Sequence, residues 1–99
     1  MARVETKIQD DIIKYLRGLG AHVENVGGGA STAKGSPDLR VCYRGRYVAF
    51  EVKRPDEDYE EPRKVQSIRI KQIRKAGGVA EVVTTIADVK RVLREEGLV

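Results

Sequence analysis

The chain has 99 residues, of which 40% are hydrophobic and 34% are charged, so it is the size of one domain and too apolar to be a disordered chain. Its single cysteine, Cys42, excludes an internal disulfide scaffold and favours a reducing, cytoplasmic compartment. No apolar run reaches the roughly 20 residues of a membrane span, and no signal-peptide pattern is present. A net charge of +4 favours a polyanionic partner. We therefore expect one domain over residues 1–99, with no membrane partner.

The first half of the chain predicts a helix followed by three strands. Ile8, Ile12, Leu16 and Leu19 recur at helical spacing and predict a helix over 4–19. A short strand is expected over 21–26, and a loop rich in glycine, serine and threonine over 27–36. Residues 39–43 and 47–53 read as two strands that flank a compact turn at 44–46.

The second half predicts a helix, a strand and a last helix. The first of these helices runs from about Pro62 to Ala76, and its buried stripe is expected to be Val65, Ile68, Ile73 and Ala76, with Ile70 off the stripe. A strand is expected over 79–84. Thr85 and Asp88 form a capping arrangement for a last helix that reaches about Glu96. This order predicts an α/β fold in which helices flank a mixed four-stranded sheet.

One cluster of polar residues falls on the predicted hairpin. Glu51 and Lys53 are two residues apart on a strand, so they point to the same face, and the hairpin brings Asp38 near them. Carboxylates suit Mg²⁺, and an ammonium suits a phosphate. An isolated Glu-x-Lys on a strand is most often an exposed ion pair. Here, however, the two charges lie on a sheet that helices are expected to cover, which favours a functional site.

The same residues carry a resemblance. Ser36-Pro37-Asp38-Leu39 followed by Glu51-Val52-Lys53 resembles the PD-(D/E)xK nuclease pattern. More narrowly, the chain is similar to the VRR-NUC family of virus-type replication-repair nucleases over nearly its whole length. Further matches are Glu5 at the head of the first helix, Gly35, and Gln66 eleven residues before Gly77-Gly78. One departure is Pro62-Arg63, where family members commonly have Leu-Ser, which puts the helix start in doubt but not the chemistry.

The resemblance implies a restriction-endonuclease-like core (αβββαβ plus a C-terminal helix) and a metal-dependent hydrolase. The implied metal ligands are Asp38, Glu51 and the backbone carbonyl of Val52. Lys53 would be the catalytic lysine, Glu5 would reach the metal, often through water, and Gln66 would approach the site. The implied cofactor is Mg²⁺, for which Mn²⁺ can substitute. Glu5 is otherwise a first-turn glutamate favoured by the helix dipole, and Gln66 a plain boundary residue.

Basic residues in the loop, at the hairpin tip and on the second helix are candidate contacts for DNA phosphates: Lys34, Arg44, Arg46, Arg63 and Lys64. Such charges are more often a solvated surface. A domain this small has little area for reading sequence, and stand-alone relatives resemble junction-resolving enzymes. We therefore expect a homodimer that cuts branched DNA, namely four-way (Holliday) junctions, in recombination and repair. The alternatives are a flap, nicking or non-specific nuclease, or a DNA-binding module whose acidic site is vestigial.

Overall fold

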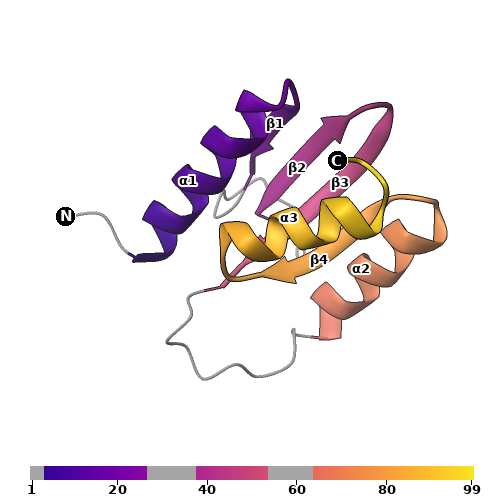
Figure 1. Cartoon of the computed structure of the whole chain (residues 1–99). Helices are drawn as coiled ribbons and strands as arrows, with labels where there is room; N and C mark the ends of the chain where they lie inside the picture. Colours follow the sequence, from indigo (N-terminus) through magenta and orange to yellow (C-terminus); the bar gives the residue numbers. More distant parts are fainter. Residues whose placement is uncertain (1–3, 27–37, 54–63) are drawn as a thin grey trace.

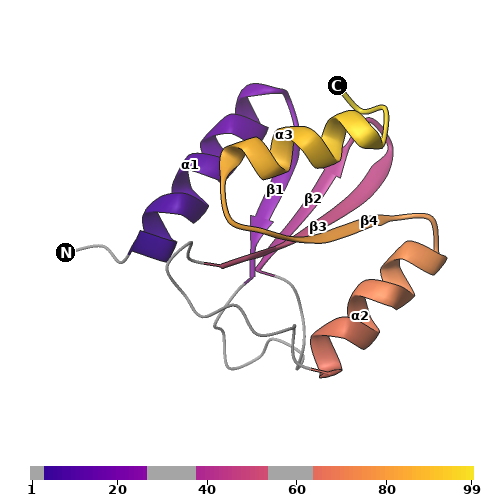
Figure 2. The ribbon, with the colours of Figure 1, turned by 60° about the horizontal axis from the view of Figure 1, so that its bottom comes forward.

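The structure is a computed structural model that describes residues 4–26, 38–53 and 64–99, with side chains from residue 7 in the first range and residue 67 in the third. A four-stranded sheet forms its centre. Figure 1 and Figure 2 show helices α1 (Val4–Gly18) and α3 (Ile86–Glu95) on one side of the sheet and α2 (Lys64–Lys75) on the other. None of the helices in these three ranges is long and apolar enough to cross a membrane.

The sheet has the strand order β1-β2-β3-β4 and is mixed, as expected from the sequence. Its strands are β1 (His22–Asn25), β2 (Leu39–Tyr43), β3 (Arg46–Val52) and β4 (Val79–Val83). The first three strands pair antiparallel, whereas α2 crosses over to place β4 parallel to β3. This confirms the predicted α/β class and element order.

The β2–β3 hairpin turns through two residues, and not through the three expected from the sequence. Arg44 and Gly45 both have positive φ, at 52° and 79°, as a type I′ turn requires. Arg46 therefore belongs to β3 and pairs with Tyr43, and Leu39 pairs with Phe50. This turn fixes which side chains of the two strands share a face.

The hydrophobic core lies between the sheet and the pair α1 and α3. Ile12 and Leu16 of α1 are fully buried against the β3 side chains that point to this face, which include Val48 and Phe50. The capping arrangement of α3 is confirmed, because Thr85 Oγ1 accepts from the Asp88 amide at 3.1 Å and the Asp88 carboxylate accepts from the Thr85 amide at 3.2 Å. The sequence therefore determines both the packed face and the start of the last helix.

Helix α2 covers only part of the opposite face, and it packs mainly against β4. The stripe expected from the sequence was wrong at two described positions. Ile68 is 47% exposed and Ala76 is exposed, whereas Ile70 and Ile73 are half-buried. Spacing alone misplaced the stripe because Ile70 and Ile73, three residues apart, lie on the side that faces β4.

Both outer edges of the sheet have a backbone carbonyl that accepts a hydrogen bond from an arginine. At the β1 edge, Arg17 Nη2 donates to the Val23 carbonyl at 3.3 Å. At the β4 edge, Arg74 Nε donates to the Ala80 carbonyl at 3.0 Å. Because strand carbonyls alternate in direction, Val23 and Ala80 turn these groups away from the neighbouring strand.

Candidate active site

Two carboxylates face each other where β2 begins and β3 ends. One step beyond the Leu39–Phe50 pair, the same register places Asp38 opposite Glu51. Side chains alternate along a strand, so these two lie on the face opposite the core, with Ala49. Glu51 is only 7% exposed and is the one charged residue among the described ranges that is buried. The hairpin therefore brings two candidate metal ligands together, as expected.

Asp38 is held by the backbone of the neighbouring strand. Its Oδ2 accepts a hydrogen bond of 2.8 Å from the Val52 amide. The N–H and C=O of one strand residue point to the same side, so the Val52 carbonyl also faces the Asp38 side of β3. A carbonyl oxygen on that side is a suitable ligand for a hard cation, as are the carboxylate oxygens of Asp38.

Lys53 completes the cluster at the end of β3. Its Nζ lies 3.7 Å from Glu51 Oε1, and its side chain is 33% exposed, against 9% for that of Glu51. The Lys53 amide donates to the Val83 carbonyl at 2.9 Å, which fixes the backbone beside β4. One ammonium thus stands at the solvent side of two carboxylates, where it can meet both an anion and the buried charge.

The electrostatics of Asp38 are dominated by burial. Burial raises the pKa of the Asp38 carboxyl above its ordinary value. The Val52 amide, the Lys53 ammonium and a hydrogen bond with the Glu51 side chain each lower this pKa, but together they do not offset the burial. Two adjacent carboxylates with one ammonium leave an excess of negative charge, and a divalent cation would remove it. Carboxylate and carbonyl oxygens are the donors that Mg²⁺ and Mn²⁺ take, so the residues fit such an ion.

The remaining site residues expected from the resemblance have no described side chains. Glu5 lies in the first turn of α1 and Gln66 in the first turn of α2, so only their backbone positions are known. Lys64 is the first residue of α2, while Lys34 and Arg63 lie outside the described residues. Within the described ranges no group of three histidine, cysteine, aspartate or glutamate side chains gathers at one point. Asp38 and Glu51 form a pair, and any third carboxylate must be one whose side chain is not described, such as that of Glu5.

Arg44 and Arg46 lie at the other end of the hairpin. Arg44 donates to the Leu98 carbonyl at 3.2 Å, and Arg46 donates to the Gly77 carbonyl at 2.9 Å and to Glu96 at 3.1 Å. Strand β3 has seven residues, which separates its two ends by roughly 20 Å. Both guanidinium groups therefore hold the C-terminal segment and the turn before β4, at a distance from Asp38.

Arg40 is a cation near the site that the sequence reasoning missed. It follows Asp38 by two residues in β2, so both side chains lie on the same face, and it pairs with Ala49 of β3. Its side chain is half-buried. The available signal was the period of two from Asp38, which places a basic residue next to the carboxylates once that strand is recognised.

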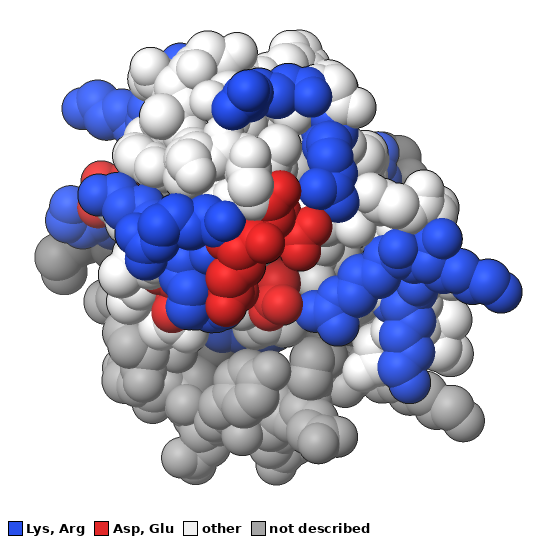
Figure 3. All heavy atoms as spheres, turned by 45° about the vertical axis from the view of Figure 1, so that its right-hand side comes forward, with Lys and Arg blue, Asp and Glu red and all other residues white. Residues whose placement is uncertain are grey.

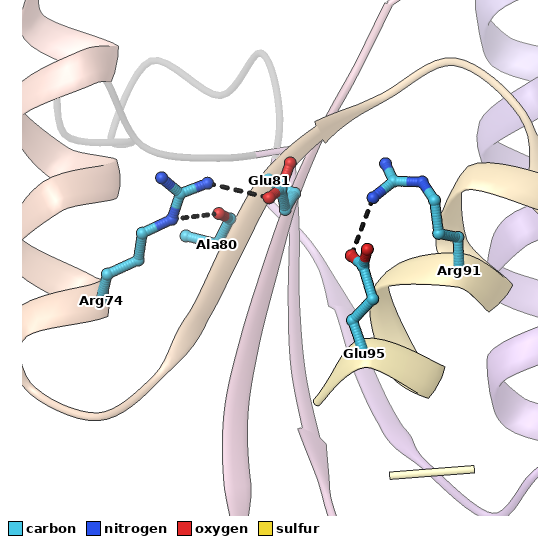
Figure 4. A network of polar contacts seen from close by, with 5 residues as sticks. All are labelled: Arg74, Ala80, Glu81, Arg91 and Glu95. Carbon is cyan, nitrogen blue, oxygen red and sulfur yellow. Dashed lines mark hydrogen bonds and ion pairs between the residues drawn. The ribbon is translucent and has the colours of Figure 1, made fainter. Parts of the chain in front are cut away.

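A second acidic group lies on another part of the surface. Figure 3 shows acidic side chains gathered between basic ones. Some of these residues, among them Arg74, Glu81 and Glu96, line a pocket of about 310 Å³ at the turn before β4. Each carboxylate there has a guanidinium partner, with distances of 2.9–3.1 Å in the pairs Arg74–Glu81, Arg91–Glu95 and Arg46–Glu96. Figure 4 shows the first two pairs. These charges are balanced, unlike those of Asp38 and Glu51, so this surface is not the candidate metal centre.

The fold and the site together define an α/β domain of the restriction-endonuclease-like class. A solved structure described as a VRR_NUC domain is similar to this chain, with a TM-score of 0.74 and 26% sequence identity, covering 94% of this chain and 97% of that chain. No family model and no curated protein matches the sequence. The similarity to that structure over nearly the whole of both chains supports the VRR-NUC family and a nuclease of the PD-(D/E)xK type.

Proposed function

We propose that this chain is a metal-dependent DNA endonuclease in which Asp38, Glu51 and Lys53 carry the reaction. The observation that supports this most is a pair of carboxylates, buried Glu51 and half-buried Asp38, which face each other with a single ammonium beside them. Burying unbalanced charge costs stability, and a protein that only binds DNA gains nothing from carboxylates turned toward phosphate. A site that binds a cation and a phosphate accounts for both charges.

Each residue of the site has a separate proposed role in metal binding or in phosphate hydrolysis. Asp38, Glu51 and the Val52 carbonyl would hold Mg²⁺ or Mn²⁺, and Glu5 would approach it from α1. When bound, the ion supplies Lewis-acid stabilisation of the phosphate and lowers the pKa of water. Lys53, at the solvent side, orients the attacking water and opposes the charge that develops on the phosphate. Water adds to phosphorus as the bond to the 3′-oxygen breaks, which leaves a 5′-phosphate and a 3′-hydroxyl.

Gln66 would assist from α2, and Lys34, Arg63 and Lys64 would contact backbone phosphates near the site. For Arg44 and Arg46 the proposal is weaker, because their carbonyl and Glu96 contacts already engage them. We propose that the whole of residues 1–99 acts as one nuclease domain.

The preferred substrate is proposed to be branched DNA, and in particular the four-way junction, cut by a homodimer. A domain of 99 residues offers little surface for base readout, so backbone geometry is the more accessible signal. A two-fold assembly would match the symmetry of a junction. A flap, nicking or non-specific nuclease is the alternative, and it would act as a monomer or with a partner.

The experiment is cleavage of labelled four-way junction, flap and linear duplex of shared sequence in Mg²⁺, Mn²⁺ or Ca²⁺. The wild type is compared with Asp38→Asn and Lys53→Ala, and Lys14→Ala of α1 serves as an exposed basic control. We expect cleavage by the wild type and the control and loss in both site variants. Cleavage that is equal in all four proteins would remove the site assignment, and efficient cutting of linear duplex by a monomer would favour the alternative.

A further inference from the structure

The sheet face that carries Asp38 and Glu51 continues along β2 and β3 away from them. On this face β2 presents Arg40 and then Cys42, opposite Ala49 and Tyr47 of β3. Successive positions on one face are two residues apart, or about 7 Å, which is the scale of one nucleotide step. The carboxylates, Arg40 and Tyr47 therefore occupy three successive positions along this face, which we call the β2–β3 row.

Arg40 is available for an anion. No hydrogen bond or ion pair engages it within residues 4–26, 38–53 and 64–99. Its cross-strand partner on β1 is Glu24, whose carboxylate instead lies 3.9 Å from the His22 Nε2 atom. Its partner on β3 is Ala49, which has neither charge nor length. A half-buried guanidinium with no partner among the described residues is suited to a phosphate group, which it can bind in a bidentate fashion.

Tyr47 occupies the next position along the β2–β3 row, beyond Arg40. It is 43% exposed and is one of only three large hydrophobic side chains that are exposed in the described ranges. It lies opposite Cys42, which is also exposed, so this end of the face is open to solvent. Helix α2 packs chiefly on β4 and leaves β1 and β2 without a helix on this side (Figure 2). An exposed aromatic ring next to a phosphate-binding cation is the arrangement that holds an unstacked base.

We propose that the β2–β3 row binds one unpaired nucleic-acid strand next to the scissile phosphate, with a neighbouring phosphate on Arg40 and a base on Tyr47. The inference rests on the proposed nuclease function and names the substrate feature that its site selects. Duplex DNA offers phosphates to Arg40 but keeps its base faces stacked, so Tyr47 acts only where a strand is unpaired. Flaps and forks supply such strands, whereas a fully paired four-way junction does not, so this row favours the flap among the branched substrates proposed above.

The test measures binding of a fluorescent splayed-arm DNA and of a blunt duplex with the same paired sequence, in Ca²⁺ and again in EDTA. Arg40→Ala is expected to weaken binding of the splayed-arm DNA roughly tenfold and to reduce the salt slope by about 0.7, the share of one phosphate on a single strand. Arg94→Ala on α3 is the control for loss of an exposed arginine. An equal effect of Arg40→Ala and Arg94→Ala would overturn the Arg40 assignment.

Tyr47→Ala is expected to weaken binding of the splayed-arm DNA on the order of tenfold, without changing the salt slope and without affecting the blunt duplex. Tyr47→Phe keeps the ring and is expected to bind as the wild type does. An equal loss on both DNAs, or a loss in Tyr47→Phe as large as in Tyr47→Ala, would overturn the stacking role. Cleavage by the wild type with unchanged binding in both row variants would refute this inference and leave the nuclease proposal intact. If the row variants lose binding of the splayed-arm DNA but the wild type cleaves no DNA, the strand-binding inference is supported and the nuclease proposal is refuted.

Discussion

Asp38→Asn tests the site in a way that separates metal binding from folding. The asparagine keeps an oxygen that can accept from the Val52 amide, which Asp38 Oδ2 does now at 2.8 Å. It removes the negative charge that burial disfavours, as the raised pKa of Asp38 indicates. Without metal, we therefore expect this variant to melt at a higher temperature than the wild type at pH 7. Asp10→Asn on the exposed surface of α1 is the matched control and should melt with the wild type.

The addition of metal should reverse this order. A ligand that binds only the folded state stabilises it by RT ln(1 + [L]/Kd), which is about 1.4 kcal/mol for roughly 10 mM Mg²⁺ and a Kd of about 1 mM. For a domain of this size that corresponds to an increase in Tm of about 6–11 °C in the wild type. Asp38→Asn should show almost none of it, and its cleavage rate should fall by at least about 100-fold, the value of some 3 kcal/mol of lost transition-state stabilisation.

The pH dependence of the melting temperature without metal should also reflect the raised pKa of Asp38. Since the pKa of Asp38 is raised in the folded protein, its contribution to stability is fully present below the unfolded pKa and is lost as the pH rises through the folded pKa. The Tm of the metal-free wild type should therefore fall relative to that of Asp38→Asn between about pH 3 and pH 7. A metal-free variant less stable than the wild type at pH 7, or one that retains the full Mg²⁺ shift, would refute the reasoning.

Three further predictions concern activity and packing. Lys53→Ala should abolish cleavage but retain the Mg²⁺-induced increase in Tm, because Lys53 is assigned to the phosphate and not to the ion; loss of that shift, read by thermal melting, would contradict this role. Gly78→Ala should lower the free energy of unfolding by about 1–3 kcal/mol in urea titrations, because the added Cβ would lie 2.8 Å from the stiff Cγ2 of Ile73. Gly18→Ala, where a Cβ meets nothing within 4 Å, is the control and should not destabilise. Arg46→Ala should lower the free energy of unfolding by about 1 kcal/mol in urea titrations, because it removes a hydrogen bond of 2.9 Å to the Gly77 carbonyl before β4 and one of 3.1 Å to Glu96 after α3. It should leave metal-induced stabilisation unchanged.

Much of the fold follows from local signals in the sequence. The spacing of Ile12 and Leu16 predicts α1, and the pairing of Thr85 with Asp88 predicts the start of α3, because a helix needs an apolar stripe and a cap. The alternation along β3 also predicted that Glu51 would leave the core face. These features depend on neighbours within a few residues, so the sequence determines them without knowledge of the tertiary structure.

The site depends on features that local patterns do not determine. A three-residue turn would have placed Asp38 opposite Val52, on the wrong face, and only the two-residue turn with positive φ at Arg44 places it opposite Glu51. Arginine is an uncommon residue for that conformation, so the turn gave a weak signal. The hydrogen bond from the Val52 amide to Asp38 also has no sequence signature, because it depends on where the β2 ladder stops.

The arginines at the two sheet edges limit how copies of this chain can associate. An open strand edge is a template for another strand, and an arginine placed across it obstructs that approach. Arg17 at Val23 and Arg74 at Ala80 stand at both edges, so neither edge can extend the sheet into a neighbouring copy without first breaking a hydrogen bond. A homodimer of this nuclease should therefore join through helices or connecting segments, and the combined variant Arg17→Ala with Arg74→Ala should aggregate on concentration where the wild type stays in solution.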